Sequence, residues 1–328
     1  MPEQAASTPL YRFRNYRQAD FDGYARLLAD AERLEPVGRC TSRQFVAGQL
    51  TRPGYSPSQD LFLAETDGGV VGYMDIKPEL RIGRVVLDCW VRPEHRRRGL
   101  GTNLGDHAIS RSRAMGAAAA HVCIPETDQA AQAVLPKLSF RQVRRFLELS
   151  LDLGESLEMR TQPSSRLTGD PEHAYCRPLR HGEQQRLAQL QNRAFAATWG
   201  YHPNTVEEIT FQIGLTTCSL ADILLVFERG ETVGYCWTTF TCEGGERSTD
   251  RGRVLMLGVD PDYRGRGAGK QALLAGLARL RSKGLRVAQL TVDSENKAAC
   301  GLYGSLGFTV EAHTLWYERP VNQDTEAR

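Results

Sequence analysis

The sequence of 328 residues lacks several features that would place a protein in a functional class at once. Its eight cysteines are scattered and form no C-x-x-C pair, which argues against a zinc site and against a disulfide framework. It also lacks an apolar run long enough to span a bilayer, and its start lacks the apolar core of a signal peptide. These absences predict a cytoplasmic protein with reduced thiols, no metal and no membrane partner.

A strong charge of either sign is also missing. The formal net charge is +2, and the overall composition is ordinary for a globular protein. Basic residues are concentrated at two turns rather than along an aromatic stripe, so we expect no nucleic-acid partner. The length is sufficient for two domains that each bury a core.

Two segments of the chain resemble each other closely. The first runs from Cys89 to Gly101 and the second from Leu257 to Gly269, and each contains an apolar strand, a proline, a basic turn and two glycines before a helix. The spacing between the copies is kept to the end of each half, where Leu-Ser-Phe at 138–140 matches Leu-Gly-Phe at 306–308. A chance motif would not keep this register, so the sequence indicates an internal duplication.

Each half has the same predicted order of elements. A strand, two helices and a hairpin lead to the motif strand, and a long helix, a strand, a short helix and a closing strand follow. The motif strands are expected at 84–91 and 253–259, and the long helices at 102–115 and 270–283. The pattern predicts an α/β protein with an N-terminal domain at 1–154 and a C-terminal domain at 174–328. A Ser-, Pro- and Gly-rich linker is expected between them, at 155–173.

The basic turn has the chemistry of a phosphate site. Its glycines allow a close approach of the backbone, and the first N–H groups of the following helix have no partner within that helix. A dinucleotide fingerprint fits nominally at Gly267-x-Gly269-x-x-Ala272, but the first copy has Leu104 in the third position. A P-loop is excluded because Gln271 stands where serine or threonine is required. A merely solvated basic face is the remaining alternative, and the duplication favours a phosphate site over it.

Two motifs carry a resemblance to a known family. Arg-x-x-Gly-x-Gly after a V-x-P strand end resembles the acetyl-CoA signature of the GNAT superfamily of N-acetyltransferases. The segment 296–308, with Asn296, Leu-Tyr at 302–303 and Gly-Phe at 307–308, is similar to the family's C-terminal motif. The resemblance covers 11–153 and 175–318, in a layout similar to mycothiol synthase-type chains. It implies two tandem domains, each a mixed, mostly antiparallel sheet flanked by helices, with a V-shaped split between its fourth and fifth strands.

The resemblance also implies acetyl-CoA as co-substrate and two sets of cofactor-binding residues. In the family, the pantetheine arm bonds the strand in the split, and the pyrophosphate lies on the basic turn. The residues implied in the second copy are Leu257, Gly258, Val259, Arg264, Gly265, Arg266, Gly267, Ala268, Gly269, Lys270 and Asn296. Those in the first copy are Cys89, Trp90, Val91, Arg96, Arg97, Arg98, Gly99, Leu100, Gly101 and Thr102.

The two copies differ where the chemistry would occur. In the family, a tyrosine donates a proton to the departing thiolate, and Tyr303 occupies that position. The first copy has Leu135 there, and Asp128 in place of Asn296. We therefore expect the C-terminal half to be catalytic and the N-terminal half to be structural, regulatory or a cofactor-only site. The general base stays open: related enzymes often carry a glutamate where this chain has Arg253, and ordered water, Glu243 or Glu246 are alternatives.

The acceptor pocket in this family lies between the loop after the first helix and the hairpin strands. In the C-terminal half that region contains Trp199, Tyr201, His202 and Trp237, which we expect to contact the acceptor. Phe195 is expected to pack in the core instead. The expected acceptor is a small-molecule amine, with a protein amine as the alternative, for a monomer or homodimer. An acyl-CoA sensor without turnover and a mycothiol synthase-like acetyltransferase stay open as other functions.

Overall fold

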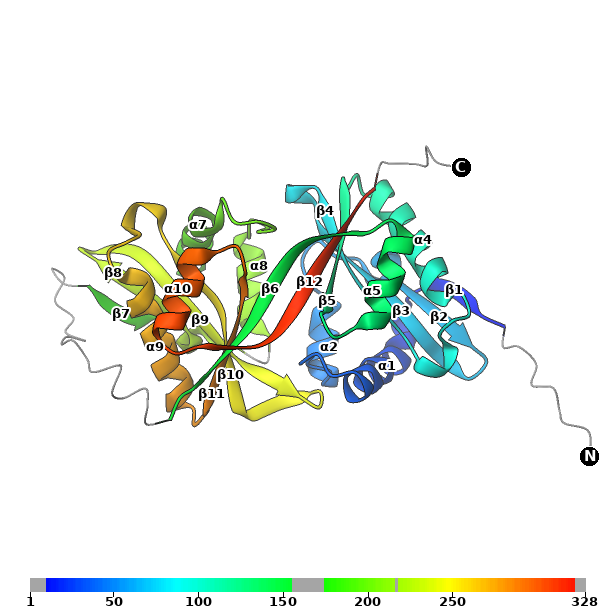
Figure 1. Cartoon of the computed structure of the whole chain (residues 1–328), viewed down its shortest axis with the longest axis horizontal. Helices are drawn as coiled ribbons and strands as arrows, with labels where there is room; N and C mark the ends of the chain where they lie inside the picture. The colour runs from blue at the N-terminus through cyan, green and yellow to red at the C-terminus, as the bar shows by residue number, and fades with distance from the viewer. Residues whose placement is uncertain (1–9, 155–173, 216–217, 322–328) are drawn as a thin grey trace, which may run out of the picture.

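The computed structural model describes residues 10–154, 174–215 and 218–321, and the linker expected at 155–173 lies outside them. The described strands form one 12-stranded sheet in the order β1-β2-β3-β4-β5-β12-β6-β11-β10-β9-β8-β7. The two copies therefore stand side by side in a single elongated molecule, with helices packed on both faces of each half (Figure 1). This confirms the predicted α/β fold, in which each half is a mixed, mostly antiparallel sheet flanked by helices, although the sheets of the two halves are joined into one.

The N-terminal half follows the predicted order of elements. Its strands are β1 (Arg12–Asn15), β2 (Leu61–Thr66), β3 (Gly69–Glu79), β4 (Arg84–Val91), β5 (Ala119–Pro125) and β6 (Arg141–Asp152). Its helices are α1 (Phe21–Leu34), α2 (Arg43–Gln49), α3 (Pro57–Asp60), α4 (Leu100–Ala114) and α5 (Gln129–Val134).

The C-terminal half repeats this order. Its strands are β7 (Tyr175–Pro178), β8 (Ile223–Glu228), β9 (Glu231–Glu243), β10 (Glu246–Val259), β11 (Val287–Asp293) and β12 (Thr309–Pro320). Its helices are α7 (Gln184–Phe195), α8 (Val206–Gly214), α9 (Ala268–Ser282) and α10 (Lys297–Ser305).

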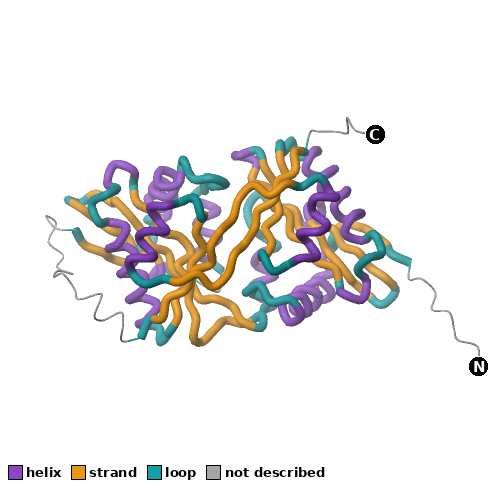
Figure 2. The backbone as a smooth tube through the Cα atoms, in the orientation of Figure 1, coloured by secondary structure: helices purple, strands orange, loops and turns teal. Residues whose placement is uncertain are grey.

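The closing strands are exchanged between the halves. The order of elements in the sequence predicts that each half is closed by its own last strand. In the structure β6 pairs antiparallel with β11 of the C-terminal half, and β12 pairs antiparallel with β5 of the N-terminal half. The two exchanged strands also pair with each other, and they cross the centre of the molecule as one long ribbon (Figure 2). The sheet is therefore continuous, and each half is completed by a strand from the other.

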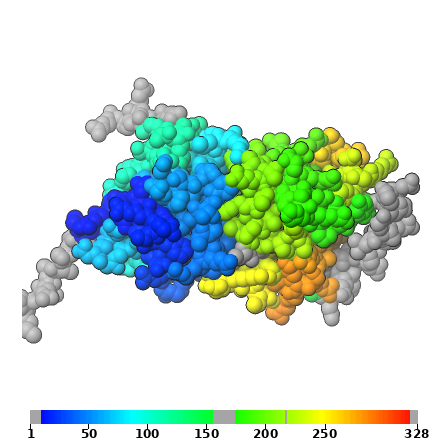
Figure 3. Space-filling model, turned by 180° about the vertical axis from the view of Figure 1, so that it is seen from behind, coloured from blue at the N-terminus to red at the C-terminus, as the bar shows by residue number. Residues whose placement is uncertain are grey.

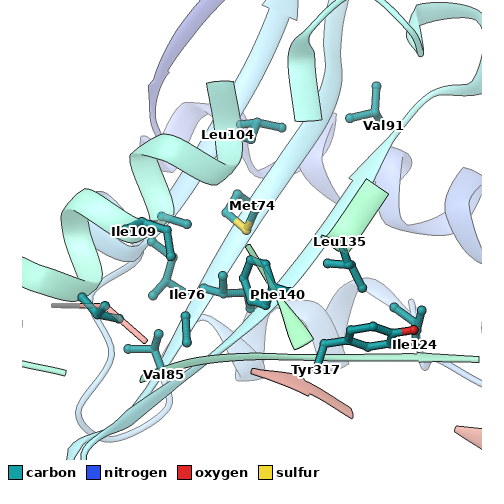
Figure 4. Close-up of a cluster of buried hydrophobic side chains, with 14 of the residues drawn as sticks. Met74, Ile76, Val85, Val91, Leu104, Ile109, Ile124, Leu135, Phe140 and Tyr317 are labelled. Carbon is teal, nitrogen blue, oxygen red and sulfur yellow. The ribbon is translucent and has the colours of Figure 1, made fainter. Parts of the chain in front are cut away.

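The exchange reaches into the hydrophobic core. Tyr317 of β12 is 6% exposed and belongs to the same buried cluster as Val85, Ile124 and Phe140 of the N-terminal half (Figure 4). Leu149 of β6 is buried in the matching cluster of the C-terminal half, against α9 and β11. Buried apolar surface is the dominant favourable contribution to folding, so these contacts hold the two halves together.

The long helices start earlier than the sequence predicts. Gly99 and Gly267 have φ of 82° and 91° and serve as N-caps, so α4 and α9 begin directly after them, at Leu100 and Ala268. A second difference concerns the motif strand of the C-terminal half, which is expected at 253–259. It begins at Glu246, because β9 and β10 continue as a hairpin that turns at Gly244 and Gly245.

A buried carboxylate occurs at the same place in both halves. Asp60 pairs with Arg111, and Asp222 pairs with Arg279 at 2.9 Å and with Lys283 at 2.5 Å. Each aspartate precedes the second strand of its half and is at most 2% exposed, so the pair fixes the long helix to the sheet. Burial acts to raise the pKa of Asp222, but Lys283, Ser219 and Arg279 together hold it below the ordinary value.

We expect Asp222→Asn to lower the free energy of unfolding by about 3 kcal/mol, since it removes a buried anion from two half-buried cations. Asp22→Asn is the matched control, because the Asp22–Arg43 pair is exposed and such pairs contribute at most about 1 kcal/mol. Urea titration measures both. Because the folded pKa of Asp222 is lowered, its stabilisation is present above the unfolded value of about 3.9 and is lost as the pH falls through the folded value. Equal effects of the two substitutions would contradict this assignment.

Candidate active site

The fourth and fifth strands of the C-terminal half separate partway along their length. The parallel strands β10 and β11 pair from Arg251 with Val287 to Arg253 with Gln289, and β10 then continues to Val259 without β11. On its other side β10 stays paired with β9. The edge of 254–259 that faces β11 therefore has backbone N–H and C=O groups free of a strand partner. An extended amide chain such as pantetheine can bond such an edge as an added strand would.

The N-terminal half has the same split. Strands β4 and β5 pair from Arg84 with Ala119 to Leu87 with Val122, and the rest of β4, with Cys89, Trp90 and Val91, runs on beyond the last pair. The V-shaped split expected from the resemblance is therefore present in both halves.

The turn that follows β10 forms an open backbone cradle. Gly265 and Gly267 have φ of 77° and 91°, and no atom lies within 4 Å of a Cβ built on either. The first intrahelical bond at this end of α9 joins Gln271 N to Gly267 O. The N–H groups of Ala268, Gly269 and Lys270 precede that bond, so they are available to an anion at the helix N-terminus.

The arginines of this turn have different surroundings. Arg264 donates from Nη2 to the carbonyl of Ala194 at the end of α7 (2.6 Å) and from Nε to Val259 O (3.4 Å). The guanidinium of Arg266 lies over the ring of Tyr263, 5.3 Å from its centroid. Arg264 thus fastens the turn to the helix beside it, and its hydrogen-bond partners are neutral carbonyls.

In the N-terminal cradle the first arginine is already paired with an anion. Arg96 donates from both Nη atoms to the carboxylate of Glu35, at 2.7 Å each, and Trp90 Nε1 donates to the same carboxylate at 2.6 Å. Arg97 has φ of 63°, a left-handed conformation that costs a non-glycine residue energy and that Gly265 adopts freely in the other copy. Arg98 donates to Tyr11 Oη at 3.2 Å. This copy has three consecutive arginines, but part of their positive charge is neutralised by Glu35.

Tyr303 lies in α10, close to both parts of the C-terminal site. Its side chain is 7% exposed in a cluster that also contacts Leu257 and Val259 of the open strand edge. The neighbouring Leu302 lies 3.7 Å from a Cβ built on Gly269 of the cradle. Burial raises the pKa of Tyr303, with further contributions from Cys236 and Cys300. The hydroxyl therefore stays protonated at neutral pH, as a proton donor must.

The corresponding position of the N-terminal half is apolar. Leu135 is 7% exposed and lies among the buried side chains of that half's core (Figure 4). The helix α5 ends at Val134, and a 3-10 turn containing Pro136 replaces the rest of the helix. This place therefore has no proton to give.

Asn296 and Asp128 have the same structural role. The Asn296 side chain accepts a hydrogen bond from Ala299 N (3.1 Å), and Asp128 accepts one from Ala131 N (2.9 Å). Both are N-caps of the short helix that follows the fifth strand. The side-chain oxygen of Asn296 is therefore used to position α10, and its contact with the cofactor stays a prediction.

A cavity of about 1420 Å³ lies between the two halves. It reaches Leu255 and Met256 of β10, next to the split, and continues to Asp88 and Lys77 on the N-terminal side. Figure 3 shows one face of the molecule, where the N-terminal half, in blue and cyan, meets the C-terminal half, in green. The cavity is large enough for a polar acceptor of the size of a disaccharide.

Three of the four residues expected at the acceptor line this cavity. Tyr201, His202 and Trp237 lie in its wall. Tyr201 donates to Asn192 Oδ1 (2.8 Å), and the buried Trp237 donates from Nε1 to Cys218 Sγ (2.9 Å). Burial, with Arg81 nearby, lowers the pKa of His202, so its imidazole is neutral near pH 7.

Trp199 lies in a different place. It packs against His121 and Trp316, with ring centroids 5.6 and 5.7 Å away, and Arg84 lies over its ring. Its neighbour Gly200 accepts a hydrogen bond from Arg84 (2.6 Å). This aromatic cluster joins the halves and is built partly from the exchanged strand β12. Phe195 stacks on Tyr201 at 5.2 Å and lies against Gly258, where an added Cβ would clash.

Candidate bases occur on both sides of the cavity. Glu243 accepts from Ser248 Oγ (3.0 Å) and pairs with Arg251 at 3.3 Å. Glu148 pairs with Arg253 and accepts from Thr291 Oγ1 (2.9 Å). Sequence reasoning missed Glu148, because it is carried by the exchanged strand β6 and enters the C-terminal site from the other half. A long-range strand pairing of this kind leaves no local signal in the sequence.

Asp88 of the N-terminal half is held by cations. It lies 3.0 Å from Arg39 Nη2 and 3.7 Å from Lys77 Nζ, and it accepts from Tyr73 Oη at 3.2 Å. Burial acts to raise the pKa of Asp88, but Arg39, Lys77 and Tyr73 hold it below the ordinary value. The carboxylate is therefore anionic at neutral pH and contributes a fixed charge to the cavity wall.

Neither a metal site nor a membrane span is evident in the described part of the chain. Among those residues, no group of three or more His, Cys, Asp or Glu side chains could hold an ion. No helix in the same ranges is long and apolar enough to cross a membrane.

Comparison with known proteins shows the family of the chain. Residues 24–140 and 185–308 each match the Acetyltransferase (GNAT) family. The chain belongs to this family and is an N-acetyltransferase of tandem architecture. GNAT enzymes use acetyl-CoA as co-substrate and act on small-molecule or protein amines.

Individual relatives extend over nearly the whole chain. A mycothiol acetyltransferase of Amycolatopsis mediterranei is 30% identical over 325 residues, which cover 91% of this chain and 99% of the relative. A GCN5-related N-acetyltransferase from Sphaerobacter thermophilus has a similar structure, with a TM-score of 0.69, 22% identity and coverage of 96% and 97% of the two chains. A tandem GNAT protein from the clavulanic acid biosynthesis pathway has a TM-score of 0.68 at 16% identity, with coverage of 96% and 100%.

Proposed function

We propose that the C-terminal half transfers an acetyl group from acetyl-CoA to a primary amine held in the cavity between the halves. One observation carries the proposal: the open edge of β10, the glycine cradle and Tyr303 are contiguous in the C-terminal half. The N-terminal half has the first two features and Leu135 in place of the third. On this basis residues 174–328 form the catalytic domain, and residues 1–154 form a structural or cofactor-only domain, with β6 and β12 exchanged.

The chemistry needs no side-chain nucleophile. The neutral amine attacks the thioester carbonyl, the C–N bond forms and the C–S bond breaks. The departing thiolate takes the proton of Tyr303, whose hydroxyl is protonated at neutral pH. The excess proton on the amine nitrogen leaves through water to a carboxylate of the cavity, for which Glu148 and Glu243 are the candidates. N–H groups of the cradle and the charge of Arg264 hold the pyrophosphate.

The acceptor we favour is a small polar amine. The cavity wall carries Asp88, Glu148 and Glu243 together with arginines, and this mixture suits a molecule with an ammonium group and several hydroxyl groups. The mycothiol acetyltransferase relatives support a cysteinyl pseudodisaccharide amine as one member of the class. A protein amine is the second candidate.

An amine panel tests the proposal through release of free CoA thiol. We expect turnover with one or more small polyhydroxylated amines, including the cysteinyl pseudodisaccharide, and none with peptides. If a peptide amine is acetylated faster than the small amines, the acceptor is a protein amine, which is the second candidate. Tight binding of acetyl-CoA with no thiol release for any amine would instead support an acyl-CoA sensor.

A further inference from the structure

A loop of the N-terminal half touches a hairpin of the C-terminal half at the edge of the cavity. The loop, residues 35–42, is held to α1 by the carboxylate of Glu32, which accepts from Gly38 N at 2.9 Å. On its other side Thr41 N donates to Gly245 O (2.9 Å), at the turn of the β9–β10 hairpin. A Cβ built on Gly245 would clash with Thr41 Oγ1, so the two segments are in close contact. Figure 1 shows this hairpin, in yellow, extending towards α1 and α2.

Two cysteines lie at this contact, one on each segment. Cys40 belongs to the loop and Cys242 to β9, and both are reduced and line the cavity. Cys242 is 6% exposed, whereas Cys40 is half-buried and open to small reagents. The neighbouring Cys242 side chain and the backbone of Ser42 lower the pKa of Cys40, although burial acts to raise it. Cys40 and burial together raise the pKa of Cys242.

This arrangement separates two chemical roles. Cys40 is the accessible sulfur and the one that ionises first, so it is the better nucleophile towards a disulfide in solution. Cys242 is shielded but in contact with Cys40, so it is placed to attack that sulfur afterwards. The other cysteines have different surroundings: Cys218 accepts from Trp237, and Cys300 donates to the backbone carbonyl of Asp293.

We propose that Cys40 and Cys242 form a reversible disulfide that ties the two halves together at the edge of the cavity. The oxidant is a low-molecular-weight disulfide. The Cys40 thiolate attacks it, forming a mixed disulfide and releasing one thiolate. Cys242 gives its proton to solvent and attacks the Cys40 sulfur, releasing the second thiolate. Two protein thiols are oxidised, and one small disulfide is reduced to two thiols.

The contact between the two segments brings the cysteines within reach of each other. Thr41 N lies 2.9 Å from Gly245 O, and a Cβ built on Gly38 lies 3.8 Å from the Cys242 carbonyl oxygen. A disulfide needs its sulfurs about 2 Å apart, which side-chain rotation and a small shift of the loop would supply. The bond would close a very long loop of chain, so it restricts the unfolded state strongly. Oxidation should therefore raise the urea midpoint of unfolding. Formation of this disulfide does not depend on the proposed acetyl transfer.

The test uses the purified full-length protein and oxidised glutathione as the small disulfide. After a timed exposure, free thiols are alkylated and the protein is digested without reduction for mass spectrometry. We expect one dominant linked species, which joins the Cys40 peptide to the Cys242 peptide and disappears on reduction. A higher urea midpoint should appear and disappear with it.

Variants make the assignment specific. Cys40→Ser and Cys242→Ala should each abolish the linked species and the shift in midpoint. The exposed Cys123 is the matched control, and Cys123→Ser should leave both unchanged. Because the linkage is mapped in the unsubstituted protein, the result does not depend on the folding of any variant. Full alkylation of Cys40 and Cys242 after oxidation, or linkage of either to another cysteine, would overturn the proposal.

Discussion

Replacing Tyr303 with phenylalanine should lower kcat by about 10²–10⁴-fold, the usual contribution of a positioned general acid. Acetyl-CoA affinity should change little, because the ring still fills its place beside Phe308 and only the hydroxyl is lost. The thiolate would then leave without a proton from the enzyme. Steady-state thiol release and calorimetric titration of acetyl-CoA separate the two effects.

Tyr317→Phe is the matched control for this substitution. Tyr317 is buried to the same degree, 6% against 7% exposed, but it lies in the core of the N-terminal half, away from the C-terminal split. Its substitution should leave kcat within a factor of a few. An unchanged kcat for Tyr303→Phe would remove the proton-donor role and leave this tyrosine as a packing residue.

The second large effect is expected at the C-terminal cradle. Gly267 has φ of 91°, and a residue with a Cβ pays about 1–2 kcal/mol for that conformation. In the proposed binding mode, the added methyl group also lies where the pyrophosphate would approach the first N–H groups of α9. We expect Gly267→Ala to weaken acetyl-CoA binding at the catalytic site by about tenfold or more, since 1.4 kcal/mol corresponds to a factor of ten.

Gly99→Ala makes the same change in the other copy, where φ is 82°. Calorimetric titration of the parent and both variants counts the occupied sites and assigns them. If Gly99→Ala loses the site with the highest affinity for acetyl-CoA and Gly267→Ala keeps it, the assignment of the C-terminal cradle to the catalytic site is contradicted.

The sequence predicted those parts of the site that are local in the chain. The strand, the glycine turn and the helix start of each cradle are contiguous, and Tyr303 follows at a fixed distance. The sequence alone therefore places Gly267 at the turn between strand and helix, and its role in cofactor binding stays a prediction. The predicted start of α9 was wrong by a short distance only, because a left-handed glycine permits a helix to begin directly after it.

Contacts between distant segments could not be predicted. β6 and β12 are the equivalent last strands of the two repeats, so either strand fits either sheet. The pattern of apolar residues therefore does not distinguish a half closed by its own last strand from a half closed by the other's. For the same reason the sequence does not predict that Glu148 reaches the C-terminal site through β6. Nor does it predict the Arg96–Glu35 pair in the N-terminal cradle. Trp199 was assigned to the acceptor by its position in a loop, and it packs between the halves because Trp316 arrives there on β12.

The central claim is that acetyl transfer occurs in the C-terminal half, and turnover of the two cradle variants tests it most directly. With any amine that the parent protein acetylates, the rate of thiol release should fall by about tenfold or more for Gly267→Ala at subsaturating acetyl-CoA. Gly99→Ala should keep the parent rate within a factor of a few. A rate that falls in Gly99→Ala and is kept in Gly267→Ala would place the chemistry in the N-terminal half and contradict the account.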